Sequence, residues 1–261
     1  MADGDVIAEN LQEVLDRMGE AALRAGRDPD DVDLVAVSKT FPATAILEAW
    51  AAGQRDFGEN RPEEGAYKIP EVLAALKEMG ASTEQAPCMP CWHMIGHIQS
   101  RKTDLVAEHF DVVHSIDRLK TARILSDLMI EDEKRIPVLI ECNVSGEASK
   151  YGFDAADWEH EDAVLERVSG QIEKVLALEG LRVEGLMTMA PLVEDPEEVR
   201  WVFASLRGLL EALASRFDAV QSPGTAWHHL SMGMTDDFEV AVEEGATMVR
   251  VGRAIFGPRT W

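Results

Sequence analysis

The chain is poor in cysteine: Cys88, Cys91 and Cys142 are the only three in 261 residues. So small and odd a number is not a disulfide framework, and it favours a reducing compartment over secretion. The first residues lack the basic and apolar regions of a signal peptide. No apolar run approaches the ~20 residues that span a bilayer. The sequence therefore predicts a cytoplasmic protein with no membrane contact.

Positive charge is also scarce, because 25 Lys and Arg face 48 Asp and Glu and the formal net charge is −23 at pH 7. Such a chain repels nucleic acids and anionic membranes at long range, so neither is an expected partner. Self-repulsion fades where the Debye length falls to about 3 Å, in ~1 M salt. The acidity is compatible with an ordinary acidic protein or with the acidic proteome of a halophile, whose cytoplasm is rich in salt. We favour the halophile.

Apolar residues are plentiful, at 46% of the chain, and the surface scaling law gives about 73% of the unfolded surface buried on folding. Short apolar and β-branched runs predict eight strands, at 33–38, 54–57, 92–95, 112–115, 136–143, 181–187, 229–231 and 247–251. Helical periodicity follows each of the first seven, at 43–52, 62–79, 99–109, 118–132, 155–178, 196–216 and 236–244. A further amphipathic helix is predicted at 5–25.

This unbroken alternation implies an α/β fold with a parallel sheet. Eight βα units in about 230 residues match a (β/α)8 TIM-type barrel with an extra N-terminal helix. An open doubly wound sheet is the alternative, because the sequence does not show that the sheet closes. No linker or shift of composition divides the chain, so we expect one domain over 1–261, with its barrel at about 33–257.

In such a barrel the reactive groups gather at the carboxyl ends of the strands. Lys39 ends the first apolar strand, and the edge of a low-dielectric barrel lowers the pKa of a lysine amine, which can then form an imine. The segments 230–235 and 249–254 follow the last two strands, where barrels often bind phosphate through backbone N–H groups. Their glycines, Gly233 and Gly252, allow close approach, and Ser231 adds a hydroxyl. The alternative for Lys39 is an ordinary surface lysine, and the alternative for Gly233 and Gly252 is that they only allow the chain to turn.

An imine-forming lysine beside a phosphate cradle suggests one ligand that carries both an aldehyde and a phosphate. Pyridoxal phosphate (PLP) meets that description, and its third recognition point is the ring nitrogen, usually met by Asp or Arg. Arg250, on the last predicted strand, is the candidate for that contact.

Six segments in sequence order resemble the signatures of one family. They are AVSKT at 36–40, FGEN at 57–60, WHMIGHIQS at 92–100, GLMTM at 185–189, LSMGM at 230–234 and VRVGRAIFG at 249–257. The chain thereby resembles the pyridoxal phosphate homeostasis proteins, the YggS/PROSC family of PLP-binding proteins, from about residue 33 onward. The resemblance implies a barrel similar to the N-terminal domain of alanine racemase, with PLP held as a Schiff base on Lys39.

By the same resemblance, Asn60 lies beside the cofactor and Arg250 faces the pyridine nitrogen. Ser231, Gly252 and Arg253 would hold the phosphate. Arg253 stands where the family often has Ser or Thr, so a hydroxyl contact is lost there while the backbone N–H remains. The role of its side chain is left open.

The family resemblance implies intracellular PLP homeostasis, by buffering or delivery, rather than robust catalysis. A racemase needs PLP as an electron sink and a base on each face, and an Arg at the pyridine nitrogen weakens the sink. The second base of alanine racemase-like enzymes is a Tyr from a second domain, whereas this chain has only Tyr67 and Tyr151 and its barrel uses the whole length. We expect a monomer that serves PLP-dependent apo-enzymes. A weak racemase or transaminase is the alternative.

The pair Cys88 and Cys91 has the spacing of half a zinc or redox site. No second Cys pair exists, and His93 and His97 belong to the strand signature at 92–100. The sequence therefore predicts no metal site.

Overall fold

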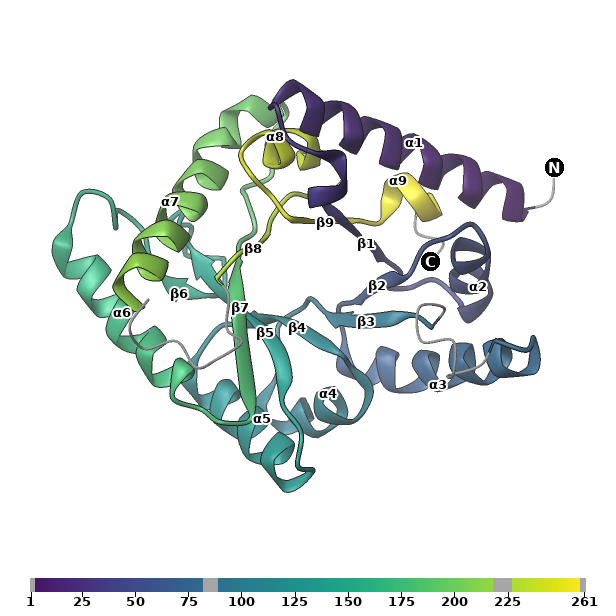
Figure 1. Ribbon diagram of the computed structural model, residues 1–261, viewed down its shortest axis with the longest axis horizontal. Coiled ribbons are helices and arrows are strands. Elements are labelled where there is room, and N and C mark those ends of the chain that lie inside the picture. Colours follow the sequence, from purple (N-terminus) through teal and green to yellow (C-terminus); the bar gives the residue numbers. More distant parts are fainter. Residues whose placement is uncertain (1–2, 82–88, 218–226, 259–261) are drawn as a thin grey trace.

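A computed structural model describes residues 3–81, 89–217 and 227–258, which form a closed barrel of eight parallel strands ringed by helices (Figure 1). The barrel strands are β1 (Asp33–Val37), β2 (Asp56–Glu59), β3 (Cys91–Met94), β4 (Val112–Ile116), β5 (Ile136–Asn143), β7 (Leu181–Met187), β8 (His229–Ser231) and β9 (Met248–Val251). A short strand β6 (Phe153–Asp154) pairs with the end of β5.

Two strand pairings close the sheet on itself. The order β4-β3-β2-β1-β9-β8-β7-β5 is completed by pairing of β4 with β5, where Val113 lies opposite Val138. The first strand pairs with the last, with Leu34 opposite Val249. The prediction of a (β/α)8 barrel is therefore confirmed, and the open doubly wound alternative was wrong.

The helices follow the predicted order. They are α1 (Asp3–Arg24), α2 (Ala43–Ala51), α3 (Pro62–Glu78), α4 (Thr103–His109), α5 (Leu119–Glu131), α6 (Asp162–Leu176), α7 (Arg200–Phe217), α8 (Phe238–Glu243) and α9 (Arg253–Phe256). Single 3-10 turns stand at Pro29–Asp31, Ser100–Lys102 and Pro196–Val199. The largest error concerns α6, because we expected a helix from residue 155. The chain there continues beside β5, since Ala155 donates its N–H to the Asn143 carbonyl, and Asp157 turns it with a φ of +59°.

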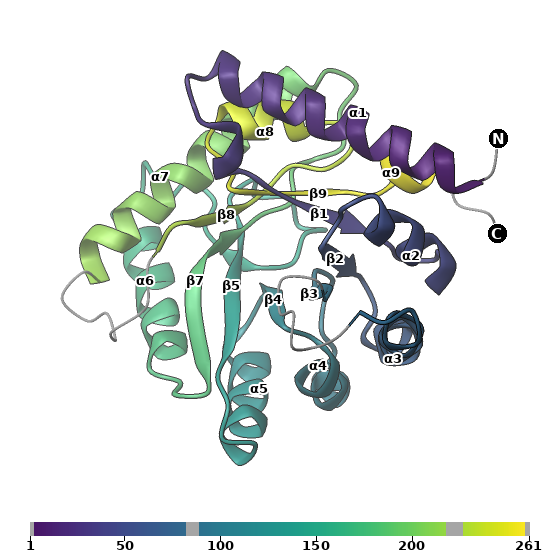
Figure 2. The same ribbon diagram turned by 45° about the vertical axis from the view of Figure 1, so that its right-hand side comes forward.

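The extra N-terminal helix α1 lies across α8 and α9 and also contacts α2 (Figure 2). Its apolar stripe is buried, and the Asn10 side chain donates to the Ile255 carbonyl at 3.0 Å. Arg17 and Arg24 form ion pairs with Glu239, and Arg24 also pairs with Glu243. The helix therefore covers the junction where the last βα unit meets the first.

Alternate strand residues face the helices or the barrel interior, as strand geometry requires. The large apolar core lies between strands and helices, while a separate small cluster of Leu139, Met187 and Met248 lies apart from it. Polar side chains such as His114 and Arg250 are buried as well. The inside of this barrel is therefore partly a polar network, which carries the site described next.

Candidate functional site

Four of the predicted site residues lie on, or one to two residues after, three neighbouring strands. In β1 and β2, Val37 pairs with Gly58, so Lys39 and Asn60 each stand two residues past that pair. In β1 and β9, Val35 pairs with Arg250. Gly252 approaches the end of β1 so closely that a Cβ on it would lie 3.0 Å from the Val37 carbonyl oxygen. The structure thus brings Lys39, Asn60, Arg250 and Gly252 to one end of the barrel.

The backbone of Lys39 is fixed on both sides by α3. The Lys68 ammonium donates to the Ser38 carbonyl at 2.9 Å, on the peptide group that precedes Lys39. The Thr40 N–H, on the peptide group that follows, donates to the Glu64 carboxylate. Thr40 has a φ of +70°, which costs a residue with a Cβ some free energy and needs support from its surroundings. The network therefore sets where the Lys39 side chain leaves the strand.

The same network contains a buried ion pair. Lys68 lies 2.8 Å from Glu59 and 2.7 Å from Glu64, and the Ser38 hydroxyl donates to Glu59 at 2.7 Å. Burial raises the pKa of Glu59, while the charge of Lys68 and its hydrogen bond act in the opposite direction. Sequence reasoning missed these residues. The one available signal was the i,i+4 spacing of Glu64 and Lys68, which is common on exposed helix faces.

Asn60 packs tightly against the loop after β3. A Cβ on Gly96 would lie 2.2 Å from the Asn60 carbonyl oxygen and 2.8 Å from its side-chain amide carbon. The Gly96 carbonyl in turn accepts a hydrogen bond of 2.6 Å from the Ser115 hydroxyl. Glycine is therefore required at position 96 if Asn60 is to keep this place.

Arg250 is buried inside the barrel, and its guanidinium makes two hydrogen bonds. Its guanidinium donates to the Ser231 hydroxyl oxygen at 2.6 Å and to the Thr188 carbonyl at 2.9 Å. Burial lowers the pKa of Arg250 to about 10, and the carboxylates of Asp237 and Glu141 counteract this. The side chain is therefore still a cation near neutral pH.

Ser231 is fully buried, and its hydroxyl lies in the interior. Besides the bond from Arg250, its oxygen lies 2.8 Å from His114 Nδ1. Burial lowers the pKa of His114 well below its ordinary value, so this ring is neutral. The hydroxyl predicted to hold a phosphate thus faces Arg250 and His114. Its contact with a phosphate stays a prediction.

Backbone hydrogen bonds join the loop after β8 to strand β9. The Arg250 N–H donates to the Gly233 carbonyl at 3.0 Å, and the Met232 N–H donates to the Met248 carbonyl at 3.1 Å. Gly233 has a φ of +92°, and a Cβ there would lie 2.6 Å from the Ala241 side chain. This glycine lets the loop pack on α8.

Arg253, which opens α9, directs its side chain to the surface. The guanidinium pairs with Asp236 and is 59% exposed. The structure therefore gives the side chain of Arg253 a partner other than a phosphate. Its backbone N–H belongs to the first turn of a helix, where such groups have no acceptor within the helix.

A loop after β5 extends over the neighbouring strand ends. The Tyr151 ring stacks on His97 with 4.0 Å between centroids, and His97 Nδ1 lies 2.8 Å from an Asp117 carboxylate oxygen. The Lys150 ammonium donates to the Ala190 carbonyl at 3.1 Å, which joins this loop to the one after β7. Below the loop, burial and the nearby Asp117 raise the pKa of Glu141 to about 7.

The barrel and its site define a class of protein. The chain matches the family described as alanine racemase, N-terminal domain over residues 3–260. The fold is similar to that of an alanine racemase from Clostridium difficile 630, with a TM-score of 0.63 at 14% identity over 96% of this chain and 56% of that one. At that identity the likeness concerns the fold alone.

Closer relatives narrow the class. The chain is 43% identical to a pyridoxal phosphate homeostasis protein of Pseudomonas aeruginosa over 98% of its length and 96% of the relative's. It is 40% identical to the protein of that name in Escherichia coli K12, over 98% and 97% of the two chains. The structure of PipY from Synechococcus elongatus with PLP bound has a TM-score of 0.71 and 32% identity, over 96% and 100%. This chain belongs to the family of the pyridoxal phosphate homeostasis proteins.

Proposed function

We propose that this protein binds PLP as a Schiff base on Lys39 and serves intracellular PLP homeostasis, by buffering the cofactor or delivering it. The observation that carries the proposal is the fixed Lys39 backbone just after β1, the strand that pairs with β9 and its buried cation Arg250. The names of the relatives and the PLP in the PipY structure support the choice of cofactor.

The donor groups fit the three parts of PLP. The aldehyde matches the Lys39 amine, with Asn60 beside it. The Arg250 guanidinium matches the pyridine nitrogen as a hydrogen-bond donor. The phosphate matches the end of β8 and the starts of the loops after β8 and β9, which hold Ser231, Gly233, Gly252 and Arg253. Backbone N–H groups in such loops are the kind of donors that bind phosphate.

Arg250 also supports carriage over catalysis. Bound PLP supplies a ring that withdraws electrons from an attached amine, and it does so best with a protonated ring nitrogen. Because the pKa of Arg250 is about 10, its side chain keeps its own protons near neutral pH. The residue therefore orients the ring without charging it.

A weak racemase or transaminase is the second candidate, and Tyr151 is the observation that favours it. Its ring lies on His97 near the strand ends, whereas Tyr67 lies on α3 and is 83% exposed. To separate the candidates, the PLP-loaded protein is incubated with L-amino acids in deuterated water. We expect no catalytic exchange of the α-proton. Exchange with turnover that Tyr151→Phe removes would establish the enzyme.

We propose a cytoplasmic monomer whose partners are PLP and PLP-dependent apo-enzymes. Cys91 and Cys142 are free thiols, as a reducing compartment maintains them. Within the described ranges, no helix combines the length and apolar character needed to cross a membrane.

The central test uses the purified wild-type chain and PLP. We expect an imine absorbance to develop on mixing, because the Lys39 amine condenses with the aldehyde. Borohydride should then fix the cofactor to the chain, and peptide mass spectrometry should find it on Lys39. A colourless protein that takes up no PLP would overturn the proposal.

The charge of −23 supports adaptation of the protein to salt. We expect the melting temperature to rise from low salt to ~1 M KCl, because screening removes self-repulsion between carboxylates. Surface pairs such as Arg216 with Glu166 weaken under the same screening, but exposed pairs contribute little. A flat or falling melting temperature would contradict the halophile assignment.

A further inference from the structure

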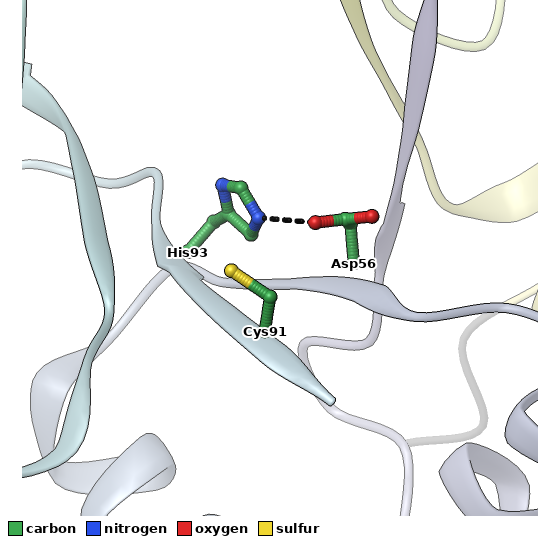
Figure 3. A group of neighbouring side chains, drawn as sticks. All are labelled: Asp56, Cys91 and His93. Atoms are coloured by element: carbon green, nitrogen blue, oxygen red, sulfur yellow. Dashed lines mark hydrogen bonds and ion pairs between the residues drawn. The ribbon is translucent and has the colours of Figure 1, made fainter. Parts of the chain in front are cut away.

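A second cluster of reactive side chains lies at the opposite end of the barrel from Lys39. Asp56 and Cys91 begin the paired strands β2 and β3 and lie opposite each other in register, and His93 follows two residues later on the same face. One donor atom from each of Asp56, Cys91 and His93 lies within 4.8 Å of the others. Figure 3 shows the three side chains together, with the Cys91 sulfur next to the imidazole and the carboxylate joined to the ring by a hydrogen bond. The proposed cofactor site uses none of these three residues.

The three donors are a carboxylate oxygen, a thiol sulfur and an imidazole nitrogen, which are the ligand types that zinc takes in proteins. Ligands about 2.0–2.3 Å from a tetrahedral metal are about 3.3–3.7 Å apart. His93 Nε2 and Asp56 Oδ1 already lie 2.9 Å apart, so small side-chain rotations bring all three to one ion. Asp56 and Cys91 are partly exposed, which gives an ion a route in from solvent.

Two features of the surroundings favour a cation over a simple hydrogen bond. The other ring nitrogen of His93 lies 2.8 Å from His114 Nε2, and this contact fixes the ring as such partners do for metal-bound histidines. The carboxylates of Asp111 and Asp33 act electrostatically on Cys91 together with Asp56. This concentration of negative charge attracts a divalent ion.

We propose that Asp56, Cys91 and His93 form a binding site for one zinc-type divalent metal ion. Three protein ligands leave a fourth tetrahedral position for water or for a further ligand. Metal binding displaces the proton of the Cys91 thiol to solvent, because the thiolate is the ligand.

The site is connected to Arg250 through the barrel. The chain of contacts runs from Asp56 to His93, His114, Ser231 and Arg250, each within 2.6–2.9 Å of the next. Without metal, His93 donates from Nε2 to Asp56, so His114 donates to His93 and Ser231 donates to His114. A metal on Nε2 of His93 moves that proton to Nδ1. Both histidines then switch tautomer, and the donor direction from His93 through His114 to Ser231 reverses, while Arg250 still donates to Ser231.

The test adds Zn²⁺ or Co²⁺ alone to the wild-type chain freed of metal by a chelator. We expect one ion bound per chain by equilibrium dialysis and elemental analysis. The Co²⁺-loaded protein should show a thiolate charge-transfer band in the near ultraviolet. Added Zn²⁺ should displace the Co²⁺ ion and abolish this band. Zn²⁺ should also shift the imidazole nitrogen resonances of both His93 and His114 in ¹⁵N NMR.

Substitutions assign the site. Cys91→Ser should remove the Co²⁺ band. Asp56→Asn should weaken Zn²⁺ binding at least about tenfold, because even the loss of a residue that only hydrogen-bonds a metal ligand has an effect of about that size. Two control variants should bind Zn²⁺ as the wild type does. One is Cys142→Ala, since the Cys142 thiol is buried away from the cluster. The other is Cys88→Ser, at a position outside the described residues. Melting curves show whether each variant folds. The proposal fails if the wild type binds no metal, if Cys91→Ser binds Zn²⁺ as well as wild type, or if Cys88→Ser loses binding equally.

Discussion

Lys39→Ala should abolish the imine absorbance of the PLP-treated protein and leave borohydride nothing to reduce onto the chain. The alanine has no amine, and the remaining contacts proposed for Arg250 and the two loops are non-covalent. PLP should therefore bind the variant only reversibly and be lost on dialysis. The measurement is an absorbance titration with PLP, followed by reduction and mass spectrometry of the intact chain.

The matched control for this variant is Lys150→Ala. Lys150 stands in the loop after β5, at the same end of the barrel, and its ammonium donates to the Ala190 carbonyl. This variant should keep the full imine signal. Melting curves of both variants show whether each one folds. An undiminished imine in Lys39→Ala, or its loss in Lys150→Ala, would reject Lys39 as the attachment point.

Lys68→Met should lower the free energy of unfolding by about 3–5 kcal/mol, the cost of removing one partner of a buried ion pair. Glu59 would stay fully buried without its cation, and the Ser38 carbonyl and Glu64 would lose their donor. Because the Ser38 carbonyl precedes Lys39, the rate of imine formation with PLP should fall as well. Denaturant unfolding gives the first quantity, and stopped-flow absorbance gives the second.

The loss of stability in Lys68→Met should depend on pH in a definite direction. Burial already raises the pKa of Glu59, and loss of Lys68 raises it further. An acid whose pKa is raised in the folded state destabilises the fold above that pKa and less so below it. The difference from wild type should therefore shrink as the pH falls through the folded pKa of Glu59.

Two further variants complete the Lys68 experiment. Lys77→Met, on an exposed face of the same helix, should change stability by less than about 0.5 kcal/mol. Adding Glu59→Gln to Lys68→Met should restore part of the stability, because it removes the unpaired charge. A Lys68→Met protein as stable as Lys77→Met at every pH would show that the network does not hold this end of β1.

Much of the fold was predictable because its signals are local. The run at 33–37 is apolar and β-branched, and the stripe of α1 repeats with helical spacing. The start of α6 was missed because pairing with β5 outweighs helix propensity after residue 152. The four-residue helix α9 was missed because so short an element shows no periodicity.

The site was predictable only in part. Lys39, Asn60 and Arg250 were predicted to lie near one another, and they do, because barrel geometry brings strand ends together whatever the details of packing. Their contacts with PLP stay predictions. The support of the Lys39 backbone by Lys68 was not predicted, because it depends on which face of α3 meets β1. The role of the Arg253 side chain was left open, and the structure pairs its guanidinium with Asp236. The cluster at Asp56 appears only once β2 and β3 are paired in register.

The pairing of β1 with β9 has a consequence for how the chain folds. Residues 33–36 lie beside residues 248–251, so this contact joins segments more than 200 positions apart. Contacts of such long range form late and slow folding, since a large loop must close first. Lys39 extends from one of these strands and Arg250 lies on the other. A partly folded chain cannot present both groups, so retention of PLP would report that the barrel has closed.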